Sequence, residues 1–336
     1  MAWVVITVPS NSLRKRIESG FAPQPFRYFH DRSGDNLADV ELHIAQFNTA
    51  TLRHPMEHPE TASFVALLDE VNALAEASPG FVWRHGIDSR NTDDPPVYED
   101  PLRLVNASVW QSLAHMREYV YKGLHRDVFR QRGDWFVSSE AVMWWVTAGG
   151  IPSLAECKAR LEFLLRHGPS PYAFETGQKF PPLVIVAREL GHPDVAPMLA
   201  RLDQELLAAT PEGGSNFLHI APEHVEDGNG AFYVAYLDDA PVACGAYRRV
   251  MGVDGAAEVK RMWADPAHRG NKLGAAVLAT IEAAARADGF EELRLETGEH
   301  LTAAIGLYTR FGFAQCDNWG EYAGVPLSYC MSKRLR

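Results

Sequence analysis

The chain has 336 residues, a length typical of about two domains, and it is 46% hydrophobic and 22% charged. These proportions exclude disordered, collagen-like and coiled-coil proteins. The net charge of -11 opposes binding to nucleic acid or to an anionic membrane surface, and no run of eighteen apolar residues predicts a membrane span.

The cysteine pattern favours a reducing compartment. Cys157, Cys244, Cys316 and Cys330 show neither C-x-x-C spacing nor the density of a disulfide scaffold. The first thirteen residues contain an apolar run that is too brief for a signal sequence and has no basic stretch before it. We therefore expect a cytoplasmic protein that holds no metal.

The first half of the chain predicts a split βαβ domain. Residues 1–36 show no sustained period and are expected to form an extension that could be poorly ordered. After them the order is strand, helix, strand, strand, helix, strand, which is typical of a ferredoxin-like fold over residues 37–178. Strands are expected at 41–48, 80–85, 102–110 and 141–147, and helices at 59–78 and 112–136. Ser153 and Glu156 form a capping box for a further helix that ends at Gly168.

The second domain is expected at residues 179–336, because four prolines between 169 and 182 interrupt every period. Its predicted elements mix helices with parallel and antiparallel strands. The strands are 183–189, 231–237, 241–250, 257–265 and 292–298, and the helices are 194–209 and one that ends at Asp288. The whole chain is therefore predicted to be α+β.

The segment from Glu258 to Gly274, EVKRMWADPAHRGNKLG, predicts an anion site. A strand passes through a turn directly into a helix, whose first amides are free and whose dipole favours negative charge. Arg269 adds positive charge, and Gly270 and Gly274 let a ligand approach the main chain. A glycine-containing turn alone is weak evidence for an anion site, because ordinary strand-to-helix connections also use glycine.

This segment resembles motif A of the GNAT superfamily of acetyl-CoA-dependent N-acyltransferases. Arg269, Gly274 and the surrounding P-x-x-R-G match the motif, whereas Lys272 stands where the family has its first glycine. We expect a helical residue there to be tolerated, since the position mainly donates its amide. The likeness extends over residues 180–336 through LETG, LYTRFGF, GEY and PLSYCMSK.

The resemblance implies a mixed central sheet and direct transfer of an acetyl group from acetyl-CoA to an amine of a small molecule or a protein. The cofactor would lie between the strands 258–265 and 292–298. The residues implied to bind it are Met262, Trp263, Ala264, Arg269, Gly270, Asn271, Lys272, Leu273, Gly274 and Ala275.

The same resemblance implies catalytic residues. Glu258 matches the family's general base, and Tyr308 matches the acid that protonates the leaving thiolate. Glu296 is a reserve base, and Glu296 and Thr297 would also meet the substrate. A protein that binds acyl-CoA without turnover remains an alternative, in which the N-terminal domain is the output or dimer module.

Residues 40–175 resemble domain-of-unknown-function family 3291, through AQFN, WWVTAGGIPSLAE and GPSPYAF. Their strand order is that of the dimeric α/β-barrel group, which implies a homodimer through the sheet. That group includes monooxygenases, so an oxygenase-like activity of this half is a further alternative. His43, His115 and His125 could be ligands or bases there, and Trp83, Trp110, Trp135, Trp144 and Trp145 could line a cavity or fill the core.

His54 and His58 have the spacing of metal ligands on one helix face. Pro55 and Pro59 follow them directly, and proline disfavours the helical conformation of the residue before it. The sequence therefore predicts no metal site at this pair.

Overall fold

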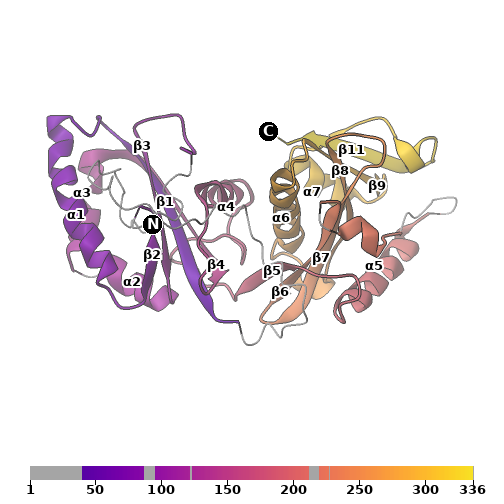
Figure 1. Ribbon diagram of the computed structural model, residues 1–336, viewed down its shortest axis with the longest axis horizontal. Coiled ribbons are helices and arrows are strands. Elements are labelled where there is room, and N and C mark those ends of the chain that lie inside the picture. The colour runs from indigo at the N-terminus through magenta and orange to yellow at the C-terminus, as the bar shows by residue number, and fades with distance from the viewer. Residues whose placement is uncertain (1–39, 87–94, 122, 212–218, 227, 336) are drawn as a thin grey trace, which may run out of the picture. The chain divides into compact units, whose positions relative to one another are not determined.

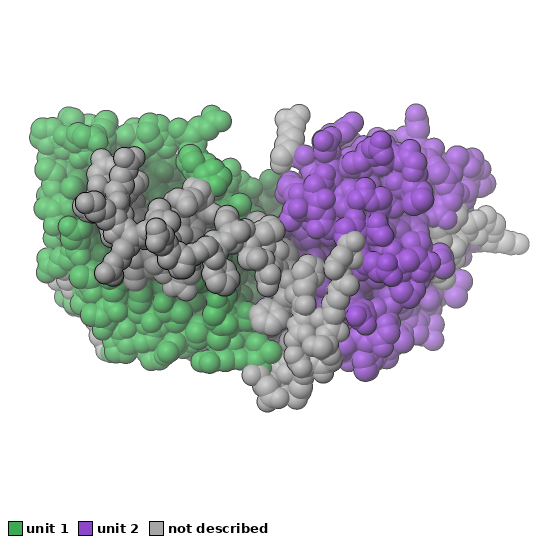
Figure 2. All heavy atoms as spheres, in the orientation of Figure 1, with its two compact units in different colours: residues 1–24, 38–182 green, residues 25–37, 183–336 purple. Residues whose placement is uncertain are grey.

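The computed structural model describes residues 40–86, 95–121, 123–211, 219–226 and 228–335. These residues form two compact units, one that ends at Pro182 and one that begins at Leu183 (Figure 2). The predicted extension of residues 1–36 lies outside the described residues. Among the helices that are described, none is both long and apolar enough to cross a lipid bilayer.

The first unit is built on a four-stranded antiparallel sheet of order β2-β3-β1-β4. Together with the chain order β1, α1, β2, β3, α2 and α3, β4, this is the ferredoxin-like arrangement that the sequence predicts. Its strands are β1 (Leu42–Leu52), β2 (Phe81–Arg84), β3 (Arg103–Trp110) and β4 (Phe136–Thr147). Its helices are α1 (Ala62–Glu76), α2 (Leu113–Tyr121), α3 (Gly123–Trp135) and α4 (Leu154–His167), with a 3-10 turn η2 (Pro59–Thr61) before α1.

Helices cover both faces of this sheet (Figure 1). On one face, Ile44 and Trp110 pack with residues of α1 and α2 in one hydrophobic cluster. On the other, α4 lies against β1 and β4. A dimer that pairs two such sheets face to face needs one open face, and α4 occupies that place here. The predicted homodimer therefore gains no support from the fold.

The single helix predicted for residues 112–136 is wrong, since α2 ends at Tyr121 and α3 begins at Gly123. Gly123 has a φ of 57°, which lies outside the right-handed helical region, so one continuous helix cannot pass through it. The prediction for α4 is confirmed at both ends. Ser153 Oγ accepts a hydrogen bond from the Glu156 amide at 3.1 Å, and Gly168 ends the helix with a φ of 74°.

The second unit has a seven-stranded mixed sheet of order β10-β11-β9-β8-β7-β6-β5. Only the β8–β9 pair of this sheet is parallel, and the predicted α+β class with a mixed central sheet is confirmed. The strands are β5 (Leu183–Ala187), β6 (Gly230–Leu237), β7 (Ala240–Arg249), β8 (Ala256–Ala264), β9 (Glu292–Gly298), β10 (Ala314–Gln315) and β11 (Ser328–Arg334). The helices are α5 (Val195–Ala209), α6 (Leu273–Ala287) and α7 (Thr302–Arg310), with short 3-10 turns η3 (Pro222–Val225), η4 (Pro266–His268) and η5 (Gly320–Tyr322).

Two helices fix the central strands of this unit. α6 is apolar on its inner face, where Val277, Leu278 and Ile281 are fully buried. α5 places Val195 and Met198 in a cluster with side chains of β6 and β7. Burial of each such aliphatic side chain stabilises the fold by roughly 1.5–3 kcal/mol, and the strands that surround the candidate site are therefore held rigidly.

Candidate functional site

The parallel ladder between β8 and β9 is short. Its facing residues run from Ala256 opposite Glu292 to Val259 opposite Leu295, and no later pair is formed. Both strands nevertheless continue, β8 to Ala264 and β9 to Gly298. Beyond Val259 and Leu295 the facing edges of the two strands are therefore not paired with each other. This is where the resemblance to the GNAT superfamily predicts the thioester of acetyl-CoA.

A β-bulge lies in β8 just past this point. Cys244 faces Trp263 and Ala246 faces Lys260, so Gly245 alone lies opposite two residues of β8. One of these two, Arg261, has a φ of 59°, which is uncommon for a residue with a side chain. A Cβ at Gly245 would lie 2.4 Å from Met262 Sδ and 2.8 Å from Val277 of α6, so the packing around the bulge favours glycine at this position of β7.

The turn from β8 to α6 differs from the prediction at one residue. Lys272 has a φ of 60° and is therefore left-handed, and α6 begins only at Leu273. The expectation of a helical residue at Lys272 was wrong. The structure shows why the family has glycine here, because left-handed backbone costs an ordinary residue roughly 1–2 kcal/mol. Gly270, with a φ of 92°, is at a second position that favours glycine.

The first turn of α6 offers hydrogen-bond donors. Ala276 is the first residue whose amide binds within the helix, to the Lys272 carbonyl at 3.0 Å. Over the described part of the chain, the amides of Leu273, Gly274 and Ala275 have no backbone acceptor. A Cβ at Gly274 would lie 3.6 Å from Leu307 of α7, which is an ordinary van der Waals distance. This helix end can bind a phosphate group.

One carboxylate connects this turn with α5. Glu205 accepts a hydrogen bond from Trp263 Nε1 at 3.0 Å through one oxygen, and pairs with Arg269 Nη2 at 3.2 Å through the other. The Arg269 side chain is 64% exposed, so it can reach a bound anion without disturbing the core. Trp263 and Arg269 are predicted from the sequence, whereas Glu205 is not, because its contacts with them span more than fifty residues.

Glu258, the predicted base, is the centre of a buried polar cluster. Its side chain is 2% exposed, and Oε2 accepts a hydrogen bond from Arg248 Nε at 2.7 Å. Oε1 accepts a hydrogen bond from the Tyr322 hydroxyl and lies 3.5 Å from Lys260 Nζ. Both oxygens are thus already engaged.

The remaining members of this cluster come from the C-terminal turn η5. Lys260 Nζ donates to the Tyr322 hydroxyl at 2.8 Å, and Arg248 Nη2 pairs with Glu321 at 2.8 Å. Burial lowers the pKa of Lys260, and burial together with the Glu258 charge raises the pKa of Tyr322. Arg248, Glu321 and Tyr322 were not predicted as site residues, although the GEY string contains the last two.

Glu296 lies in β9, one residue past the last pair of the parallel ladder. Its carboxylate accepts a hydrogen bond from Ser328 Oγ at 2.7 Å. Burial raises the pKa of Glu296, although the Ser328 hydrogen bond and the Lys260 charge act in the opposite direction. Thr297 follows it and is 7% exposed. Of the two candidate carboxylates, Glu296 has the fewer charged contacts.

Tyr308 is buried in α7, where its ring meets Phe313 edge-on with centroids 5.9 Å apart. Burial raises the pKa of Tyr308, and the Glu296 charge raises it further. The phenol is therefore protonated at neutral pH and is a proton donor. The structure thus connects Tyr308 electrostatically with Glu296, and Glu296 with the cluster around Glu258.

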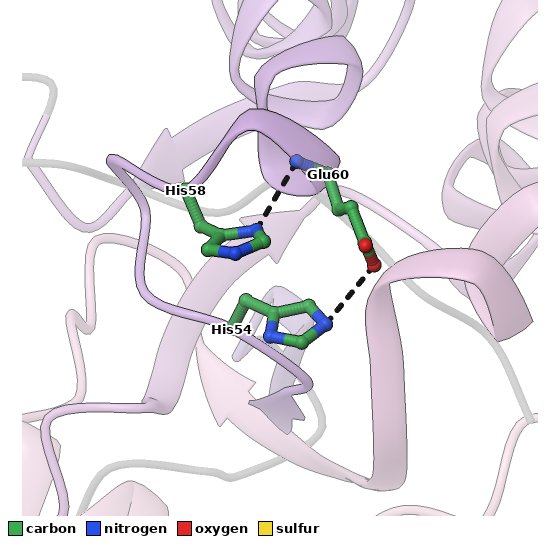
Figure 3. Close-up of side chains that lie close together, drawn as sticks. All are labelled: His54, His58 and Glu60. Atoms are coloured by element: carbon green, nitrogen blue, oxygen red, sulfur yellow. Dashed lines mark hydrogen bonds and ion pairs between the residues drawn. The ribbon is translucent and has the colours of Figure 1, made fainter.

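In the first unit, the described side chains give no group that contains the three predicted histidines. His43 is buried in β1 with Nε2 3.5 Å from Glu41, and His115 Nδ1 lies 3.0 Å from Ser112 Oγ. The side chain of His125 lies outside the described residues. His54 and His58 do lie together, with Glu60 beside them (Figure 3).

Family comparisons match each half of the chain. Residues 43–188 match the family described as domain of unknown function DUF3291, and residues 199–313 match the acetyltransferase (GNAT) family. Two solved structures are similar to 46% of this chain and to 98% of their own. A putative acyl-CoA N-acyltransferase from Klebsiella pneumoniae is 32% identical with a TM-score of 0.38. A GNAT family acetyltransferase from Elizabethkingia anophelis, solved with acetyl-CoA bound, is 15% identical with a TM-score of 0.33.

Two curated relatives match the C-terminal half. A protein named IAA acetyltransferase from Azospirillum brasilense is 35% identical over 158 residues, which are 46% of this chain and 99% of that protein. The uncharacterized N-acetyltransferase YsnE of Bacillus subtilis is 33% identical over 106 residues, 31% of this chain and 69% of that protein. The chain therefore belongs to the GNAT family of acetyltransferases, and it is an N-acetyltransferase enzyme.

Proposed function

We propose that the second unit transfers an acetyl group from acetyl-CoA to an amine of a small molecule or a protein, by direct attack within a ternary complex. The observation that carries this proposal is the end of the parallel ladder at Val259 and Leu295, close in sequence to the free amides that begin α6. A diphosphate at the helix and a thioester between the strands together fit one extended cofactor.

The cofactor is proposed to bind mainly through main-chain groups. The amides of Leu273, Gly274 and Ala275 and the Arg269 guanidinium would bind the diphosphate, whereas the Asn271 amide already donates to the His268 carbonyl at 3.4 Å. The pantetheine arm would pair with the free edge of β8 at Met262 and Ala264. The bulge at Gly245 supports this, because a bulge leaves an amide of β8 outside the ladder, where it can polarise the thioester carbonyl.

Glu296 is our proposed general base. A base needs a free lone pair and a pKa near the working pH, and burial raises the pKa of Glu296 while one serine hydroxyl binds it. Glu258, the base that the sequence predicts, has both oxygens bound by Arg248 and Tyr322. We propose that Glu258 instead positions Lys260 and Tyr322 beside the acceptor.

The proposed reaction is a single displacement. Glu296 takes a proton from the acceptor ammonium, and the neutral amine attacks the thioester carbonyl. The carbon–sulfur bond then breaks as the new amide forms, and the nitrogen releases its second proton to water. Tyr308 gives its proton to the leaving thiolate, a role supported by its protonated state, and regains a proton from water. Binding both substrates side by side supplies much of the rate, since it removes the entropy cost of their encounter.

A calorimetric titration with acetyl-CoA followed by thiol release with a panel of amines tests the proposal. IAA is tested beside this panel, because the Azospirillum relative is named after it. We expect acetyl-CoA to bind at one site per chain and CoA to be released only with an acceptor. Binding without any thiol release across the panel would instead support an acyl-CoA-binding sensor.

A further inference from the structure

The first unit contains a compact group of three metal-ligand side chains between β1 and α1. His54, His58 and Glu60 each offer one donor atom, and these atoms all lie within 4.8 Å of one another. His54 Nε2 is 3.0 Å from Glu60 Oε2 (Figure 3). Two ligand atoms bound to one tetrahedral Zn²⁺ at 2.0–2.1 Å lie roughly 3.3 Å apart, so this pair needs little movement.

The backbone of this segment is fixed by its own hydrogen bonds. The His58 amide donates to the Pro55 carbonyl at 3.0 Å, and the Thr61 amide donates to the His58 carbonyl at 2.9 Å. Pro55 and Pro59 restrict φ at two further positions. The prolines that exclude a helical His pair thus rigidify a turn that gathers the same ligands. A preorganised turn lowers the entropy cost of binding an ion.

The two imidazole rings require one adjustment. They are stacked with centroids 4.2 Å apart and planes 18° apart, so their in-plane lone pairs do not point to one position. His58 Nδ1 also accepts a hydrogen bond of 3.3 Å from the Glu60 amide. Rotation of a ring about its Cβ–Cγ bond is nearly free for an imidazole, and the His54 side chain is 38% exposed. Binding therefore needs a ring rotation and no change of backbone.

We propose that His54, His58 and Glu60 bind a divalent first-row transition metal ion, with Zn²⁺ as the closest fit. Two imidazoles and one carboxylate suit Zn²⁺ and its neighbours, whereas Mg²⁺ and Ca²⁺ prefer oxygen ligands only. Three protein ligands leave at least one position for water or another small ligand, which is the pattern of catalytic rather than structural zinc. This site is independent of the acetyltransferase site and gives the DUF3291 unit a binding activity of its own.

Titration of the full-length chain, freed of metal, with Zn²⁺ tests the proposal. We expect one ion per chain, and an affinity that falls more than about 100-fold in His54→Ala and His58→Ala, beyond the 10–100-fold typical of outer-shell changes. Glu60→Gln should weaken binding while leaving the fold unchanged, since this side chain is 69% exposed. Mg²⁺ should not compete.

Co²⁺ offers a spectroscopic test of the ligand set. Its visible spectrum should report nitrogen and oxygen ligands without a thiolate charge-transfer band, which excludes binding at a cysteine. His219→Ala is the matched control, because His219 also lies near a second histidine, His224, with ring centroids 5.5 Å apart. Wild-type protein that binds no Zn²⁺, or a His54→Ala, His58→Ala double variant that binds it as well as wild type, would overturn the proposal.

Discussion

Arg248 and Glu258 face each other on neighbouring strands and are joined by a hydrogen bond of 2.7 Å between Nε and Oε2. Glu258 is 2% exposed and the Arg248 side chain 16% exposed, so water hardly screens this pair. This partner and Tyr322 each bind one oxygen of the Glu258 carboxylate and so hold it within the buried cluster. In our proposal, this pair gives Glu258 a structural role and leaves Glu296 as the reactive carboxylate.

Glu258→Gln should lower the free energy of unfolding by about 3 kcal/mol, because removal of one buried partner leaves the other charge uncompensated. Chemical denaturation of the full chain measures the effect. Glu321→Gln is the matched control. Its side chain is 48% exposed and pairs with the same arginine, so its loss should change stability by less than about 1 kcal/mol. Equal effects of both substitutions would contradict the buried role of Glu258.

Glu296→Gln should reduce kcat by about 100-fold or more, the usual contribution of a general base. Since the deprotonated carboxylate is the active form, the wild-type rate should rise with pH through a pKa above the ordinary glutamate value of 4.5, because burial raises it. The pH–rate profile of the variant should no longer show this rise at acid pH. An unchanged rise in Glu296→Gln would show that another group is the general base.

The raised pKa of Glu296 predicts that Glu296→Gln stabilises the fold at neutral pH. Glu296 keeps its proton to a higher pH in the folded protein than in the unfolded chain. This preference stabilises the fold fully below the unfolded pKa, and the contribution is lost as the pH rises through the folded pKa. Glu296→Gln should therefore raise Tm at neutral pH but not below the unfolded pKa. A variant less stable than wild type at neutral pH would contradict this.

Tyr308→Phe should lower kcat by about 100-fold and leave acetyl-CoA affinity unchanged, since it removes only the proton donor. Burial raises the pKa of Tyr308 above the ordinary tyrosine value of 10.0. The wild-type rate should consequently show no loss from phenol ionisation below that pH. Full activity of the variant would exclude Tyr308 as the acid.

Substitutions at Lys272 should separate backbone strain from side-chain chemistry. Lys272→Gly and Lys272→Ala remove the same amine, but only glycine adopts a φ of 60° without strain. We expect the glycine variant to be more stable than the alanine variant by about 1–2 kcal/mol. Thermal melting of the two variants measures the difference, and equal stability would mean that the turn changes conformation.

Gly270→Ala should weaken acetyl-CoA binding about tenfold, a change equivalent to about 1.4 kcal/mol, because a side chain at a φ of 92° displaces the turn before α6. Calorimetric titration measures it. Gly191→Ala is the control, since Gly191 lies in the same unit with open space around it. Equal affinities of the two variants would exclude this turn as the diphosphate site.

The order of the elements could be predicted from the sequence because it depends on local signals. Alternation, helical spacing and the cap at Ser153 all act within a few residues. The break at Gly123 was missed because helix-favouring residues on both sides outweighed one glycine. The backbone conformation of single residues was harder to predict than the order of the elements. Nothing in the sequence shows that Lys272 is left-handed, since φ there depends on how the whole turn joins β8 to α6.

Partners of the site residues could not be predicted for a similar reason. Glu258 and Tyr322 are sixty-four residues apart, and only the folded sheet brings η5 beside β8. In the first unit, the spacing of His54 and His58 was visible, but their meeting depends on turn hydrogen bonds that the prolines fix rather than on a helix.

Glu205 belongs to α5, and its carboxylate is shared between the indole of Trp263 and the guanidinium of Arg269. An anion that binds Arg269 in place of Glu205 breaks the ion pair between these two side chains. Glu205 then keeps only its hydrogen bond with Trp263, and α5 is attached to the turn by one contact fewer. If the diphosphate binds Arg269 as we propose, cofactor binding should therefore alter how α5 is attached to this turn, and a shift of α5 should alter the affinity for the cofactor.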